Sequence, residues 1–94
     1  MDAILDQIRL KQRDLILFLR DLVECESPSD SSTGIRRFND LLAASVADIA
    51  RCRFVRRHLL IEFKLPGRRV RDRQLLGLGH SDTVWPMGTL KTMP

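Results

Sequence analysis

The most informative stretch of the sequence is Leu75-Leu76-Gly77-Leu78-Gly79-His80-Ser81-Asp82. Its first part, residues 75–79, is a short continuous apolar run, which is typical of a strand buried on both faces of a sheet. Gly77 and Gly79 provide no side chain to pack, which indicates close approach of another backbone or of a bound group. The stretch therefore predicts an interior strand that leads directly into a histidine.

Two helices are predicted before this strand. In residues 3–25 the apolar side chains recur at helical spacing, with no proline or glycine between them. Pro28 ends this helix, because a proline pushes the preceding residue out of the α region. The apolar run 15–19 leaves no polar side, so we expect the middle of the helix to be covered on more than one side. A second helix is predicted from the capping segment 29–32 to about Ala50.

After the second helix the apolar period changes from helical spacing to two. Residues 52–54 predict a short edge strand, and residues 59–65 predict a longer strand with one apolar face. Pro66-Gly67 is a turn signal, and the polar run 68–73 continues the loop. The predicted fold class is α/β, with two N-terminal helices followed by about three strands that begin a mixed sheet sandwiched by helices. The length allows one domain, residues 1–94.

Composition and charge exclude several classes of protein. Hydrophobic residues make up 44% of the chain, which is too many for a disordered protein. The formal net charge is +4, and arginines gather in residues 51–73, so a basic surface that binds phosphates must be considered. However, four Phe, one Trp and no Tyr offer few rings for base stacking, which disfavours nucleic acid as a partner.

No export or membrane signal is recognisable in the sequence. The run Leu15–Leu19 is far shorter than the roughly 20 residues that a membrane span needs. Residues 1–4 are not the basic start of a secretory signal. We therefore expect a cytoplasmic protein without a membrane partner, in which Cys25 and Cys52 are reduced thiols.

His80 and Asp82 are the candidate chemical residues. Two positions apart on an extended chain, their side chains project to the same side. In α/β sheets, ligands bind outside the carboxyl ends of the strands, which is where His80 is expected. A carboxylate beside a metal-binding imidazole accepts one ring N–H and fixes the tautomer. From the residues alone, a metal site and a surface histidine with a polar neighbour remain equally open. His58 is expected to be an exposed residue at the start of a strand, and neither cysteine shows metal-site spacing.

The motif continues as Thr83-Val84-Trp85-Pro86-Met87-Gly88-Thr89-Leu90. The whole motif resembles the first metal-ligand motif of the zinc-dependent exopeptidase and deacylase family, which includes glutamate carboxypeptidase, acetylornithine deacetylase, succinyl-diaminopimelate desuccinylase and the aminoacylases. Its Trp-Pro-x-Gly-Thr-Leu part is most similar to the glutamate carboxypeptidase branch. Residues 22–29 resemble the family's break between its first two helices. The resemblance implies the phosphorylase/hydrolase-like catalytic domain of a zinc peptidase.

The resemblance also implies roles for individual residues. His80 resembles the first zinc ligand, and Asp82 resembles the catalytic carboxylate that orients it. Trp85, Pro86 and Gly88 resemble the loop that lines the mouth of the site. The family binds two Zn²⁺ ions through two His and three carboxylates and uses a further Glu as general base. No Asp, Glu, His or Cys follows Asp82, so at most a partial site is expected here.

Two functions follow from these observations. The first is the amino-terminal part of a zinc-dependent metallopeptidase or amidohydrolase that hydrolyses a terminal peptide or N-acyl amide bond and is inactive alone. The resemblance implies a small peptide or N-acyl amino acid as the substrate of the whole enzyme, and it is compatible with a homodimer. The alternative is a non-catalytic small α/β binding or interaction module that uses the basic surface of residues 51–73.

Overall fold

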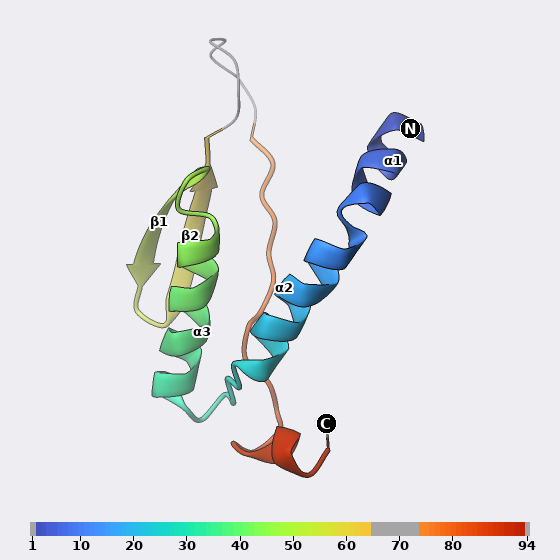
Figure 1. Cartoon of the computed structure of the whole chain (residues 1–94). Helices are drawn as coiled ribbons and strands as arrows, with labels where there is room; N and C mark the ends of the chain where they lie inside the picture. The colour runs from blue at the N-terminus through green and yellow to red at the C-terminus, as the bar shows by residue number, and fades with distance from the viewer. Residues whose placement is uncertain (1, 65–73, 94) are drawn as a thin grey trace.

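The computed structural model describes residues 2–64 and 74–93 (Figure 1). Three α-helices come first, followed by two strands and a short 3-10 helix. Their bounds are α1 Asp2–Leu10, α2 Gln12–Glu24, α3 Ser32–Ser45, β1 Ala50–Val55, β2 His58–Phe63 and η1 Thr89–Lys91. The mixed α/β class that the sequence predicts is therefore confirmed. The predicted turn 66–67, the loop 68–73 and the end of the second predicted strand at Leu65 lie outside the described residues.

The single helix predicted over residues 3–25 is interrupted at Lys11, which separates α1 from α2. The Lys11 N–H donates to the carbonyl of Ile8 at 3.1 Å, and the Lys11 carbonyl accepts from Leu15 N–H at 2.9 Å. Hydrogen bonding therefore continues through the break, and neither proline nor glycine accounts for it. The expected cover over residues 15–19 is wrong for the described part of the chain, because Leu15 is 50% exposed and Leu19 is 60% exposed.

Helix α3 begins at the predicted cap. The Ser31 hydroxyl accepts the N–H of Gly34 at 3.0 Å, which pairs one otherwise free donor of the first turn. Gly34 is buried against the preceding segment, and a Cβ atom at this position would lie 2.8 Å from the Glu26 carbonyl oxygen. The helix ends at Ser45 rather than near residue 50, because Ala50 is already the buried first residue of β1.

Strands β1 and β2 form an antiparallel hairpin, with Cys52 opposite Ile61 and Phe54 opposite Leu59. These four residues alternate with exposed neighbours, as the period of two predicts. The Arg36 guanidinium of α3 lies 3.7 Å from the centre of the Phe54 ring, which places this face of the hairpin against α3. The small core of the described chain lies there, and its buried apolar residues are Ile35 and Ala50.

The predicted interior strand at residues 75–79 is not part of a sheet. The described sheet has two antiparallel strands, not the start of a mixed sheet, and residues 74–82 run as an extended segment without strand pairing (Figure 1). Leu75 is fully exposed, and Leu78 is 90% exposed. A strand needs a neighbour for its backbone hydrogen bonds, and no described segment provides one along residues 74–82.

None of the helices within residues 2–64 and 74–93 combines the length and the hydrophobicity that crossing a membrane requires.

Candidate functional site

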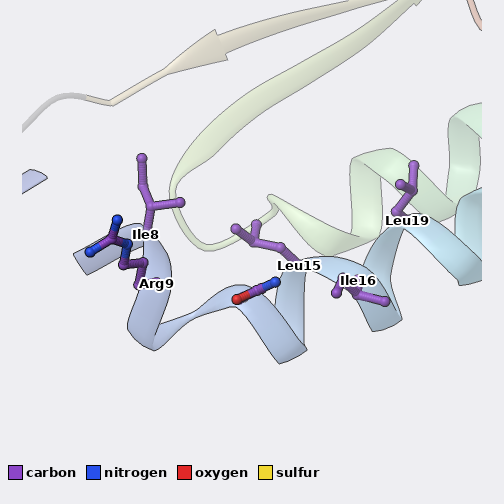
Figure 2. Close-up of a pocket in the computed structure, with 6 residues that line it drawn as sticks. Ile8, Arg9, Leu15, Ile16 and Leu19 are labelled. Carbon is purple, nitrogen blue, oxygen red and sulfur yellow. The ribbon is translucent and has the colours of Figure 1, made fainter. Parts of the chain in front are cut away.

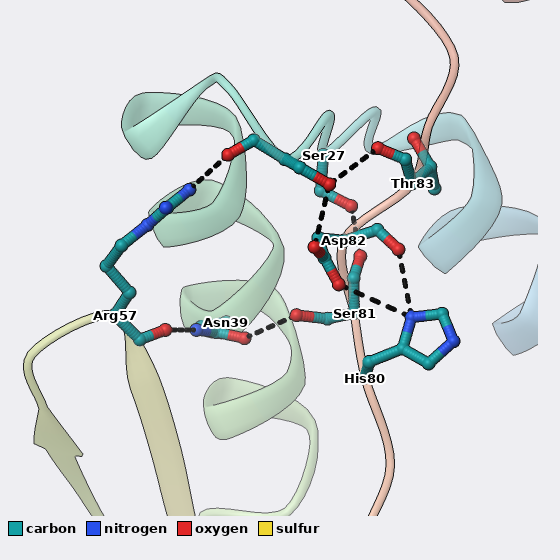
Figure 3. A network of polar contacts seen from close by, with 8 residues as sticks. Ser27, Asn39, Arg57, His80, Ser81, Asp82 and Thr83 are labelled. Atoms are coloured by element: carbon teal, nitrogen blue, oxygen red, sulfur yellow. Dashed lines mark hydrogen bonds and ion pairs between the residues drawn. The ribbon is translucent and has the colours of Figure 1, made fainter.

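His80 and Asp82 are brought together as the sequence predicts. The Nδ1 atom of His80 lies 3.3 Å from Oδ1 of Asp82 and 3.0 Å from the backbone oxygen of the same residue (Figure 3). Both neighbours are acceptors when the carboxyl is ionised, so Nδ1 must carry the proton in a neutral ring. Nε2 then keeps its lone pair. The His80 side chain is 85% exposed, which leaves this nitrogen accessible.

The segment that carries this pair is fixed to the residues just after α2. Pro28 and Thr83 form a parallel bridge, in which Thr83 N–H donates to the Ser27 carbonyl at 2.9 Å and Ser29 N–H donates to the Thr83 carbonyl at 2.9 Å. Ser27 is buried, and its hydroxyl donates to the Ser81 carbonyl. The Ser-Pro-Ser turn after α2 thereby aligns the backbone on which His80 and Asp82 sit.

The Asp82 carboxylate has a second partner on the same turn. The Ser29 hydroxyl donates to Oδ2 of Asp82 at 2.7 Å. This hydrogen bond is the main reason that the pKa of Asp82 is lowered from its ordinary value, against the opposing effect of partial desolvation; its own backbone and His80 lower it further. Asp82 is therefore ionised near neutral pH and is suited to accept the ring N–H of His80.

A buried amide connects this segment to the hairpin. Asn39 of α3 is only 4% exposed; its Nδ2 donates to the Arg57 carbonyl at 3.1 Å, and its Oδ1 accepts from the Ser81 hydroxyl at 3.4 Å. Arg57, in the turn between β1 and β2, donates through Nη2 to the Ser29 carbonyl at 2.7 Å. Figure 3 shows Asn39 between Arg57 and Ser81. The site segment is thus supported by α3 and the hairpin together.

Glu26 holds the loop that follows the site. Its two carboxylate oxygens accept the backbone N–H groups of Gly88 at 2.7 Å and Leu90 at 2.9 Å. These two bonds, Leu90 first, lower the pKa of Glu26 from its ordinary value. Gly88 has φ 93°, a left-handed conformation that glycine adopts without steric cost. The predicted mouth loop is therefore anchored at its far end, and it carries Trp85 57% exposed.

Sequence reasoning missed Glu26, Ser29 and Asn39 as supporting residues. Their partners lie far away along the chain, so periodicity carries no signal for them. The resemblance of residues 22–29 to a family segment drew attention to the right turn, but it assigned no contact to Glu26 or Ser29.

The described residues do not form a complete metal site. No group of three or more His, Cys, Asp and Glu side chains that could hold a metal ion occurs within residues 2–64 and 74–93. His58 is exposed at the start of β2, as predicted. One imidazole with a free Nε2 fits a single ligand position of a zinc centre, which needs three or four protein ligands.

Helices α1 and α2 line an open apolar groove away from these residues. Figure 2 shows the side chains that line it, which are Ile8, Arg9, Gln12, Leu15, Ile16 and Leu19. Neither His80 nor Asp82 belongs to the groove. The lining carries one charged side chain and no pair of groups for acid–base chemistry.

Two arginines of the expected basic surface, residues 51–73, are engaged within the described part of the chain. Arg51 pairs with Glu62 across the hairpin at 3.4 Å. Arg57 supports the Ser29 backbone. These contacts give the arginines structural roles on exposed surfaces. The rest of the predicted basic stretch, residues 65–73, lies outside the described residues.

Comparison with known proteins gives no match, whether to a protein-family model, to a curated protein or to a solved structure. The case for a function therefore rests on the motif and on the geometry around His80.

Proposed function

We propose that this chain forms the amino-terminal part of the catalytic domain of a zinc-dependent hydrolase that cleaves a terminal peptide or N-acyl amide bond. The observation that supports it most is the contact between His80 and Asp82. Two oxygens of Asp82 face Nδ1 of His80, at 3.0 and 3.3 Å, and the His80 side chain is 85% exposed, an arrangement that suits a metal-binding imidazole. The enzyme that this proposal describes has a phosphorylase/hydrolase-like fold and takes a small peptide or an N-acyl amino acid as its substrate.

Each described residue has a distinct task in this proposal. His80 provides one ligand through Nε2, and Asp82 keeps the ring oriented and in the correct tautomer. Zinc at such a centre supplies Lewis-acid polarisation of the amide carbonyl and lowers the pKa of a bound water. The Glu26 anchor holds the loop that carries Trp85, which follows the metal-binding segment in the chain.

The remaining ligands and the general base belong, in this proposal, to a part of the enzyme beyond the described residues. The chain by itself therefore binds zinc weakly and does not catalyse hydrolysis. Weak binding should nevertheless occur at His80 in preference to His58, because a carboxylate lies beside the other ring nitrogen of His80, and none does so at His58 among the described residues.

The test is a zinc titration of the 94-residue chain. Long-range ¹H–¹⁵N spectra of the two imidazole rings are recorded at each zinc concentration. We expect zinc to shift Nε2 of His80 at lower concentrations than any nitrogen of His58. His80→Ala should remove this response, and the matched variant His58→Ala should keep it. Equal responses of both rings, or a response at His58 alone, would contradict the proposal.

A further inference from the structure

Ser29 makes an independent structural contact with each of its three polar groups. Its N–H donates to the Thr83 carbonyl at 2.9 Å, and its carbonyl accepts from Arg57 Nη2 at 2.7 Å. Its hydroxyl donates to Oδ2 of Asp82 at 2.7 Å and also lies 3.0 Å from the Thr83 carbonyl. The backbone of Ser29 is thus held without the hydroxyl, and the hydroxyl is aimed at Asp82.

The Asp82 carboxylate is held at both of its oxygens. Oδ2 accepts from Ser29, and Oδ1 faces Nδ1 of His80 at 3.3 Å. A carboxylate fixed at one oxygen has a defined plane, because rotation about its bond to the rest of the side chain would break that hydrogen bond. Ser29 therefore fixes the direction of Oδ1, which is one of the two oxygens that face Nδ1 of His80; the other is the backbone oxygen of Asp82, at 3.0 Å.

We propose that Ser29 is a positioning residue of the candidate metal centre, which acts through Asp82 to keep Nε2 of His80 unprotonated and pointing outward. The inference rests on the proposed function in one respect, the assignment of Nε2 as a zinc ligand. The link from Ser29 to the His80 ring can be measured without any metal.

The first experiment compares the unchanged chain with Ser29→Ala, Ser29→Thr and the control Ser45→Ala. Ser45 is exposed, and its hydroxyl donates to the Leu41 carbonyl at 2.7 Å within α3, so this control removes an equivalent hydroxyl away from the site. The readout is the tautomer of the neutral His80 ring in long-range ¹H–¹⁵N spectra. We expect Ser29→Ala to shift His80 towards the Nε2–H tautomer, Ser29→Thr to restore the Nδ1–H tautomer, and Ser45→Ala to leave it unchanged.

The amide signal of Thr83 reports whether the backbone bridge survives, since its N–H bonds to Ser27 and not to Ser29. An unchanged His80 tautomer in Ser29→Ala would overturn the inference. Loss of the Thr83 bridge in this variant would also overturn it, because Ser29 would then hold the backbone rather than the carboxylate.

The second experiment repeats the zinc titration with the same variants. We expect Ser29→Ala to raise the zinc concentration at half response of His80 by about threefold to tenfold, below the 10–100-fold that a direct partner of a ligand typically contributes. If His80 of the unchanged chain does not respond to zinc, the proposed function fails, while the tautomer comparison still decides the role of Ser29.

Discussion

The Glu26 carboxylate and the backbone N–H of Gly88 are joined by a hydrogen bond of 2.7 Å, although 62 positions separate the two residues in the chain. The other oxygen of Glu26 accepts the N–H of Leu90 at 2.9 Å. An ionised carboxylate that accepts two backbone donors makes stronger bonds than a neutral group. This contact joins the turn after α2 to the loop after the candidate site.

Glu26→Gln should release that loop. A glutamine has one acceptor oxygen, so its amide group would face one of the two N–H donors of Gly88 and Leu90. We expect amide exchange at these two positions to become faster by about an order of magnitude, with Ile35 unchanged. The matched control is Glu24→Gln, since Glu24 is exposed and, within residues 2–64 and 74–93, pairs with Arg20 of its own helix alone. Equal protection in both variants would show that Glu26 does not anchor the loop.

The same contact should make the loop sensitive to acid. The two backbone hydrogen bonds lower the pKa of Glu26 from its ordinary value of 4.5, so the folded loop favours the ionised carboxyl. Its stabilisation is complete above the ordinary pKa and is lost as the pH falls through the lowered pKa. Fluorescence of Trp85, the one tryptophan of the chain, should follow this release with a midpoint below 4.5. A midpoint at or above that value would contradict the anchor, and Glu26→Gln should abolish the transition.

The exposed apolar side chains of α1 and α2 should make the isolated chain associate. Leu15, Ile16 and Leu19 are each at least half exposed and line one groove, and contiguous apolar surface of this kind promotes aggregation. We expect sedimentation to show concentration-dependent association. Leu19→Gln should weaken it by about tenfold, the order expected when a buried leucine contact is lost, and Arg13→Gln on the same helix should not. A monomer with a sharp cooperative thermal transition would contradict this expectation.

Helix α3 and the hairpin could be predicted from the sequence because their signals are local. Ile35 lies on the apolar stripe of α3, and Cys52 and Phe54 alternate with arginines along β1. The strand predicted at residues 75–79 is wrong for the described chain. Its apolar run shows what the segment would bury, but a strand also needs neighbours, and periodicity does not say which segments supply them.

In the candidate site, too, the local contacts could be predicted from the sequence and the long-range contacts could not. His80 and Asp82 are two positions apart, so extended geometry alone predicts their contact. The hydrogen bond from Ser29 to Asp82 spans 53 positions, and that from Leu90 to Glu26 spans 64. Contacts of this kind arise only when the turn after α2 and the segment after β2 come together, which no local pattern encodes.

His80→Ala and Asp82→Asn should have different effects in a catalytic domain that contains this chain. Removing the imidazole removes a ligand, so we expect loss of one bound zinc and of hydrolysis. Asp82→Asn keeps the shape but not the charge, and it should lower zinc affinity or activity by about 10–100-fold. His58→Ala is the control and should retain both. Full zinc content and full rate in His80→Ala would show that His80 is not a ligand.

The most direct test of the account is the tautomer of His80 in the metal-free chain, measured by long-range ¹H–¹⁵N spectra at a pH where the ring is neutral. The contacts of Nδ1 with Asp82 predict the Nδ1–H form, with Nε2 unprotonated, whereas exposed His58 should show the Nε2–H form that free imidazole side chains prefer. Asp82→Asn should shift His80 towards the form seen for His58. If His80 of the unchanged chain already carries its proton mainly on Nε2, the nitrogen that the account assigns to zinc is not prepared to bind it, and the central claim is wrong.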